Sequence, residues 1–287
     1  MKFGKRTYKK GERAGLLFIL PSLLGTGIFL LLPLLDVARR SFLEAVNGRW
    51  VGFANYQAVF ENPAFRLAGM NTIRFTVSCI PLLLVLSLLI AVFLHRQTKL
   101  GSLLKSAFLV PMAIPTASVV LLWRFVFQPQ GLLNECLSLF SVQGQDWMNA
   151  EGAFGVLVFS YLWKNLGYDI VLWIAGLSGI SESIYEAARV DGAGELKCFL
   201  YITLPNLLPS LYTISVLSLL NSFKVFREAY LLAGDYPHES IYMMQHLFNN
   251  WFRDLDLDKM AAAAVVNGMI IFLLILFLRR AWDKGET

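Results

Sequence analysis

The sequence is poor in the residues from which most enzyme sites are built. It has three histidines and three cysteines among 287 residues. The cysteines, Cys79, Cys136 and Cys198, are odd in number and far apart, which argues against a disulfide framework. No metal-ligand cluster or recognisable nucleophile motif is present, and the Gly-x-x-x-x-Gly-Lys-Ser/Thr loop that binds nucleotide phosphates is missing. We therefore expect no enzyme activity and no cofactor, metal or nucleotide site in this chain.

Charged residues are scarce at 16%, whereas 56% of residues are hydrophobic and the mean hydropathy is +0.57. The apolar residues gather in runs of about 20, the length that a helix needs to cross a hydrocarbon core. We expect six membrane-spanning helices, at about 15–35, 72–94, 106–127, 154–177, 207–223 and 260–278. Several prolines lie in or near these runs, which favours a packed bundle because neighbouring helices satisfy the freed backbone groups. The predicted fold is an all-α, polytopic helix bundle.

The distribution of Lys and Arg predicts the orientation of this bundle. Six spans place both termini on one side, and the segments on that side carry 14 basic residues against 8 on the other. Basic residues are enriched on the cytoplasmic side of membrane proteins. We therefore expect both termini in the cytoplasm. The net charge of +5 is then explained by topology, and we expect no nucleic acid as a partner.

The segment between the fourth and fifth spans, on the predicted cytoplasmic side, is polar. Ser183 and Glu186 have the spacing of a capping box, and Gly192 suits a left-handed turn at a helix end. A second helix can run from Glu195 to Ile202, before Pro205 introduces the fifth span. We expect a helix, a sharp turn and a second helix close to the membrane.

The spacing of residues in this segment resembles a known family. Glu186-Ala187-Ala188, three residues, Gly192, nine residues, then Ile202, Leu204 and Pro205 is similar to the cytoplasmic loop in permease subunits of binding-protein-dependent ABC importers. The stretches Leu17–Pro21, Trp163-Lys164 with Gly167, and Tyr230–Leu232 with Gly234 resemble the sugar-importer branch, of maltose and glycerol-phosphate type. Two positions depart from the family pattern, because Ser181 stands where proline is common and Ala233–Pro237 replaces a Gly-Gly-Pro run.

The resemblance implies a type I ABC importer permease. It implies a cytoplasmic tail at 1–14, a first helix at 15–35, a transmembrane domain of five helices at 67–279 with a coupling loop at 180–206, and a tail at 280–287. The loop would dock on a cytoplasmic ATPase subunit that binds ATP, through Glu186, Ala187, Ala188, Asp191, Gly192, Ile202, Leu204 and Pro205. The other implied partners are a second, different permease subunit, an extracytoplasmic solute-binding protein and the lipid of a bacterial inner membrane.

Three basic residues lie in or near the predicted spans. Arg74 and Arg124 are close to span ends, where long side chains reach the interface. Lys164 is near mid-span and has two interpretations. It faces a water-filled pathway together with Trp163, Tyr168 and Asn221, or it is a structural lysine bonded to neighbouring helices, which we favour.

Apolar residues recur at helical spacing before the sixth span: Ile241, Met244, Leu247, Phe248 and Trp251. They predict an amphipathic helix on the outer side. It either contacts a binding protein or packs on the bundle.

The leading interpretation is a permease subunit for a sugar or oligosaccharide. The alternatives are an ABC permease for another solute, such as a sugar phosphate, and a secondary transporter that needs no ATPase. The sequence does not identify the solute.

Overall fold

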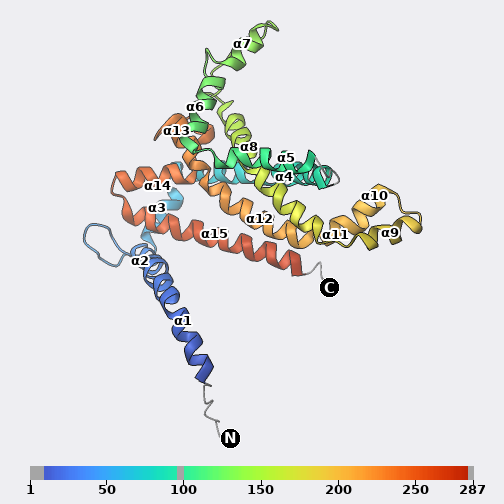
Figure 1. Ribbon diagram of the computed structural model, residues 1–287. Coiled ribbons are helices and arrows are strands. Elements are labelled where there is room, and N and C mark those ends of the chain that lie inside the picture. Colours follow the sequence, from blue (N-terminus) through green and yellow to red (C-terminus); the bar gives the residue numbers. More distant parts are fainter. Residues whose placement is uncertain (1–9, 96–99, 284–287) are drawn as a thin grey trace. The chain divides into compact units, whose positions relative to one another are not determined.

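The computed structural model describes residues 10–95 and 100–283. They form helices joined by connections, of which those at 41–53 and 139–152 are long (Figure 1). The tail predicted at 1–14 lies outside the described residues except for its last five, and so do residues 284–287 of the second tail. Lys99 and Arg96, which contribute to the predicted charge asymmetry, are likewise outside them. The described residues divide into two units, one within 1–61 and 251–270 and the other within 62–250 and 271–287.

The first unit begins with one long apolar helical segment. It comprises α1 (Lys10–Thr26), a π-helical turn η1 (Gly27–Leu31) and α2 (Leu32–Arg40), and is followed by α3 (Ala54–Glu61). Pro33 lacks an N–H group, which removes a regular helical hydrogen bond. The N–H of Leu32, just before it, instead donates to the carbonyl of Gly27, five residues back. The proline thus explains the π-turn without ending the helix.

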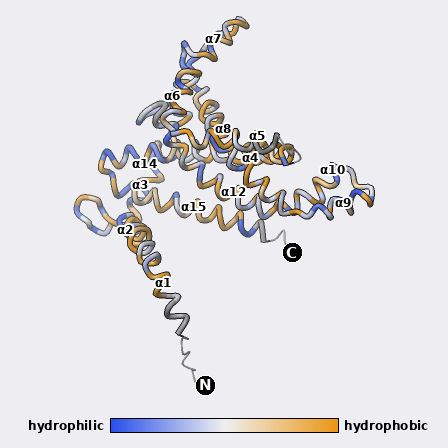
Figure 2. Tube along the Cα trace, in the orientation of Figure 1, coloured by the Kyte–Doolittle hydropathy of each residue, from blue (hydrophilic) through white to orange (hydrophobic). Residues whose placement is uncertain are grey.

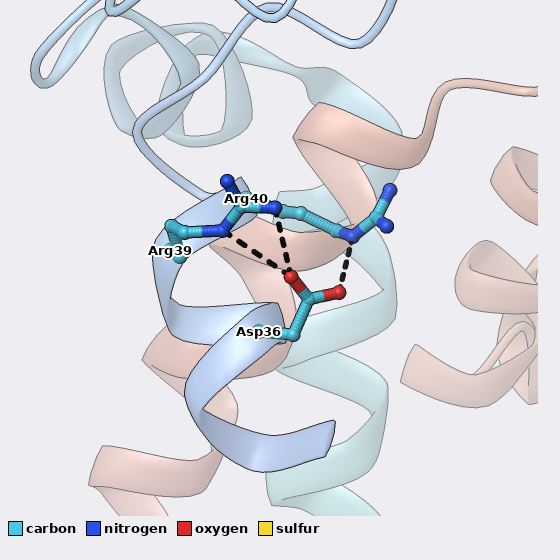
Figure 3. Close-up of polar contacts among 3 residues, drawn as sticks. All are labelled: Asp36, Arg39 and Arg40. Carbon is cyan, nitrogen blue, oxygen red and sulfur yellow. Dashed lines mark hydrogen bonds and ion pairs between the residues drawn. The ribbon is translucent and has the colours of Figure 1, made fainter. Parts of the chain in front are cut away.

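The end of α2 is organised by one carboxylate (Figure 3). Asp36 Oδ1 accepts hydrogen bonds from Arg39 Nε at 3.3 Å and Nη2 at 3.0 Å, and Asp36 Oδ2 accepts one from Arg40 Nε at 2.6 Å. Both arginines stand in the last turn of α2, where cations interact favourably with the helix dipole.

The second unit is built around α4 and α8. Its helices are α4 (Pro63–His95), α5 (Leu100–Ala113), α6 (Thr116–Phe127), α7 (Leu132–Ser138), α8 (Ala153–Ser178), α9 (Glu182–Val190), α10 (Glu195–Cys198), η2 (Phe199–Thr203), α11 (Leu204–Asn206), α12 (Leu208–Ser222), η3 (Phe223–Val225), α13 (Phe226–Ala233), η4 (Glu239–Ile241) and α14 (Met244–Arg253). Two helices contribute to both units, because α14 crosses the boundary at Trp251 and the last helix, α15 (Leu257–Asp283), crosses it at Ile271.

Two clusters of buried side chains hold α4 against α8. One includes Phe75, Leu83 and Leu157, and the other includes Leu94 and Trp173. The indole N–H of Trp173 donates to Ser87 Oγ of α4 at 2.9 Å. The polar atom of a buried tryptophan is thus satisfied inside the bundle.

Three segments of the described residues are long and apolar enough to cross a membrane: Leu17–Arg40, Pro63–His95 and Leu257–Arg280. Two bent pairs qualify when each is taken as one span, Ser106–Ala113 with Thr116–Ser138 and Glu195–Asn206 with Leu208–Tyr230. Figure 2 shows hydrophobic residues along the length of α12 and α15. This composition confirms a helical, multi-pass membrane protein.

The run predicted at 106–127 is not one straight helix. It bends by 98° between Ala113 and Thr116. Pro115 is extended, with φ −56° and ψ 138°, and begins α6 as its N-cap. A proline disfavours helical geometry in the residue before it, so the chain turns here.

The helix predicted before the sixth span is present as α14. Ile241, Met244, Leu247 and Trp251 are buried, and Phe248 is half-buried. The apolar face is therefore covered by protein, which favours the interpretation of a helix packed on its own bundle.

Candidate functional site

The segment from α9 to α10 forms a hairpin (182–198), which Figure 1 shows beyond the end of α8. It is called the coupling hairpin below, after the role that the sequence resemblance implies for it. The prediction of a capping box at Ser183 and Glu186 is wrong, because α9 begins at Glu182 and Ser183 therefore lies inside the helix. Ser181 is the N-cap, with extended backbone at φ −65° and ψ 133°, and its side chain does not cap the helix. Ser181 Oγ lies 2.8 Å from Ser183 Oγ, so the two hydroxyls bond each other.

The turn of the coupling hairpin has the predicted left-handed glycine. Gly192 has φ +79°. Its N–H donates to Arg189 O at 3.1 Å, and the N–H of Ala193 donates to Ala188 O at 2.9 Å. This pair of bonds is a Schellman motif, which satisfies carbonyls at a helix end and fixes the direction of the chain beyond it.

Side chains brace the two arms of the coupling hairpin. Tyr185 Oη lies 2.9 Å from Thr203 Oγ1, which joins α9 to η2. Arg189 Nη2 lies 3.5 Å from Glu195 Oε1 across the turn. The ion pair is exposed and contributes little, whereas the hydroxyl bond is partly buried. The hairpin is therefore a defined unit rather than a loose loop.

The tip of the coupling hairpin is exposed. Val190 is 88% exposed and Leu196 is 72% exposed. Glu186, Ala187 and Asp191 are exposed as well. Apolar side chains beside a carboxylate on a projecting turn are suited to a protein partner.

Three residues of the predicted loop lie beyond this tip. Ile202 is in η2, and Leu204 and Pro205 are in α11, so the second arm continues to Asn206 rather than ending at Ile202. As at Pro33, the N–H before the proline, that of Leu204, bonds five residues back to Phe199 O. The fifth predicted span begins after a 63° bend, at α12.

A polar cavity of about 180 Å³ opens at Lys164 of α8. Lys164 Nζ lies 2.7 Å from Glu228 Oε1 of α13 and 2.7 Å from Thr116 Oγ1 of α6. The side chain of Lys164 is 18% exposed and that of Glu228 is 8% exposed. One ammonium group therefore ties three helices together. The residues that line the cavity are Met112, Thr116, Tyr161, Lys164, Asn165, Asn221, Val225, Arg227 and Glu228.

The four residues predicted on a pathway do not all meet. Lys164 and Asn221 line the cavity. Trp163 packs on Trp123, with ring centroids 5.2 Å apart, and neither Trp163 nor Tyr168 is among the lining residues. The ion pair fits the structural interpretation of Lys164, and the cavity leaves the pathway interpretation open.

Sequence reasoning missed the carboxylate that pairs with Lys164. Glu228 follows the fifth predicted span, 207–223, and was not singled out, although a mid-span lysine needs a buried partner. It also missed Asp169 of α8, which is 1% exposed and accepts a hydrogen bond from Ser218 Oγ of α12 at 3.0 Å. The signal was available, because Asp169 stands in a predicted span.

Within residues 10–95 and 100–283, no group of three His, Cys, Asp or Glu side chains is placed to hold a metal ion. The features described above are ion pairs, hydrogen bonds and an exposed hairpin.

Comparison with known proteins agrees with this chemistry. A family model described as "Binding-protein-dependent transport system inner membrane component" matches residues 56–284. The arabinooligosaccharides transport system permease protein AraP of Bacillus subtilis (strain 168) is 34% identical over 228 residues, which cover 77% of this chain and 72% of AraP. The inner membrane ABC transporter permease protein YcjO of Escherichia coli (strain K12) is 30% identical over 276 residues, or 92% of each chain.

The fold also matches a solved structure. A chain of a bacterial ABC transporter involved in the import of the acidic polysaccharide alginate aligns with a TM-score of 0.87 at 22% identity, covering 98% of this chain and 99% of that one. This likeness establishes the fold, and the family match establishes the kind of protein. The chain belongs to the binding-protein-dependent transport system inner membrane components, and is a permease subunit of an ABC importer whose ATP is hydrolysed by a separate ATPase.

Proposed function

We propose that this subunit forms, with a second and different permease subunit, the pathway for a sugar or oligosaccharide. The family description supports delivery by a solute-binding protein. The name of AraP, a permease for arabinooligosaccharides, supports a saccharide as solute. The coupling hairpin carries the proposal, because a braced turn with an exposed tip is what an ATPase subunit needs in order to move the helices.

We propose six spans with both termini in the cytoplasm. The three single segments and the two bent pairs account for five of them. The 26-residue α8 is the remaining one, since about 20 residues suffice to cross the membrane. The boundaries proposed are 15–35 for the first helix and 67–279 for the domain with the other five, including the coupling loop at 180–206. The tails at 1–14 and 280–287 are then cytoplasmic, in agreement with the excess of Lys and Arg on that side.

The proposed mechanism uses the coupling hairpin as a lever. ATP binding closes a pair of ATPase subunits, which draws the two coupling hairpins of the permease pair together. Because the Schellman turn and the Tyr185–Thr203 bond fix the hairpin, the movement passes through α10 and α11 into α12. The bundle then alternates between inward-open and outward-open states.

The experiment is to replace residues of the hairpin and to measure ATP-driven uptake and subunit composition. Glu186→Lys reverses the exposed charge that faces the ATPase. Gly192→Pro places a residue that requires φ near −65° where φ is +79°. We expect both variants to insert in the membrane, to lose uptake, and to lose the ATPase in mass spectrometry of the gently solubilised complex. Wild-type uptake by both variants would rule out the coupling role.

A further inference from the structure

The cavity at Lys164 holds an unbalanced positive charge. Its lining includes two cations, Lys164 and Arg227, and one anion, Glu228. Lys164 and Glu228 neutralise each other, with Nζ and Oε1 2.7 Å apart. Arg227 is left as the surplus cation of the cavity.

Arg227 is placed to meet a molecule in the cavity. Its side chain is exposed, and among the residues that the structure describes it has no ion-pair partner. Glu228, the next residue, accepts a hydrogen bond from Lys164. Lys164 lies eleven residues after Ala153, the first residue of α8, which is about 16 Å along the helix axis. Arg227 is thus held near the same level of the bundle, where a cation is costly unless it faces water or a counter-ion.

The size and lining of the cavity limit what can enter. A volume of about 180 Å³ is below the roughly 300 Å³ at which pockets for drug-sized ligands begin, so it suits one sugar unit or one acidic substituent. Asn165 and Asn221 also line it, and amide side chains are able to bond hydroxyl groups. A guanidinium presents a planar fork of donors that matches a carboxylate or a phosphate.

We propose that Arg227 determines specificity, by binding an acidic group on the solute, so that the importer carries an anionic saccharide. This inference rests on the proposed function, in which the cavity lies on the solute pathway. The shared chemistry is a sugar with a carboxylate or phosphate substituent. A neutral sugar bonds the amides equally well but leaves the charge of Arg227 unmatched.

The test is a calorimetric comparison of matched sugars on the permease copurified with its partner subunits in lipid nanodiscs. Galacturonate is compared with galactose, and glucose 6-phosphate with glucose, so that each pair differs by one acidic group. We expect the acid to bind at least about tenfold more tightly in one pair or both, because charge-assisted bonds are the strong ones. The pair of sugars with the larger difference in affinity identifies carboxylate or phosphate as the group bound.

Three variants test whether this difference in affinity between acidic and neutral sugar, the affinity gap, arises in the cavity. Arg227→Gln should reduce it to about twofold or less, and Arg227→Lys should keep part of it. Arg49→Gln, which removes an exposed arginine outside the cavity, should leave it unchanged. A melting curve establishes that each variant is folded.

The inference is overturned if acid and neutral sugar bind equally or not at all, or if the gap survives in folded Arg227→Gln. ATP-driven uptake confined to neutral sugars would also overturn it, while leaving the permease function intact. Failure of the permease function itself is recognised separately, by uptake that needs no ATPase.

Discussion

At the scale of single residues, Lys164 shows how a charge is kept inside an apolar bundle. Its ammonium group meets a carboxylate and a hydroxyl, each at 2.7 Å, from two other helices. Replacing one member of a buried pair leaves the other uncompensated, which costs more than the pair contributes when intact. The pair is therefore a stronger constraint on sequence than its net stabilisation suggests.

We predict that Lys164→Met destabilises the folded protein by about 3 kcal/mol, because it strands Glu228. Glu228→Gln also leaves the Lys164 ammonium without a counter-ion, but it should cost less, because the amide oxygen still accepts a hydrogen bond from Lys164. The double variant Lys164→Met, Glu228→Leu should recover most of the loss. Denaturation in detergent, run as a double-mutant cycle, measures the coupling, and additive effects would show that the pair does not exist in the folded protein.

The turn of the coupling hairpin offers a second test at one residue. A Cβ at Gly192 meets nothing within 4 Å, so Gly192→Ala is penalised only by its φ of +79°. We expect a cost of about 1–2 kcal/mol and a lower ratio of uptake to ATP hydrolysis.

Gly194 is the matched control, because a Cβ there also meets open space and its φ is −74°. Gly194→Ala should leave coupling unchanged, and its cost in stability should come only from the N-cap position of α10, where alanine is less favoured than glycine. Equal effects of the two variants would argue against a role for the left-handed turn.

At the scale of elements, α8 is the helix on which the second unit depends. It contacts α4, α5 and α12, and it provides both Lys164 and Asp169. A Cβ at Gly167 would collide with the carbonyl of Phe108 in α5, and one at Gly176 would collide with Ser210 of α12. Small residues thus let neighbouring backbones approach closely, as is common between membrane helices.

We predict opposite signs for two glycine substitutions in α8. Gly167→Ala should destabilise the protein by about 1–3 kcal/mol, because α5 must move away. A Cβ at Gly155 meets nothing within 4 Å, so Gly155→Ala should stabilise the helix by up to about 1 kcal/mol. Thermal denaturation of both variants measures the two changes in stability. A Gly167→Ala variant as stable as the wild type would contradict the close approach of α5 and α8.

Much of the fold was predictable at this scale because apolar runs and glycine turns are local signals. Gly192 lies at a helix end as its type indicates, and α4 and α15 include the predicted second and sixth spans. The 98° bend before α6 was not predicted, because prolines are also tolerated within helices here, as Pro81 is in α4. The bond from Lys164 to Glu228 joins residues 64 positions apart, so only the packed helices bring them together.

At the scale of the whole molecule, the proposed orientation has a direct consequence for the native cysteines. Cys79 and Cys198 are buried, whereas Cys136 in α7 is exposed. In the proposed topology α7 lies outside and the coupling hairpin inside. We predict that a membrane-impermeant maleimide labels Cys136 in right-side-out vesicles and not in inside-out vesicles.

The complementary variant is Cys136→Ser with Val190→Cys, since Val190 is 88% exposed at the hairpin tip. It should be labelled only in inside-out vesicles that have been washed free of peripheral subunits. Labelling of both positions from the same side would contradict the proposed arrangement of spans.

The central claim is that an ATPase on another chain drives this permease through the coupling hairpin. Its most direct test is uptake, into proteoliposomes, of the saccharide that the cognate binding protein carries, with and without the ATPase subunits. The account predicts uptake only when the ATPase subunits and ATP are both present, and none with Glu186→Lys. Uptake at the same rate by the permease subunits alone would contradict it.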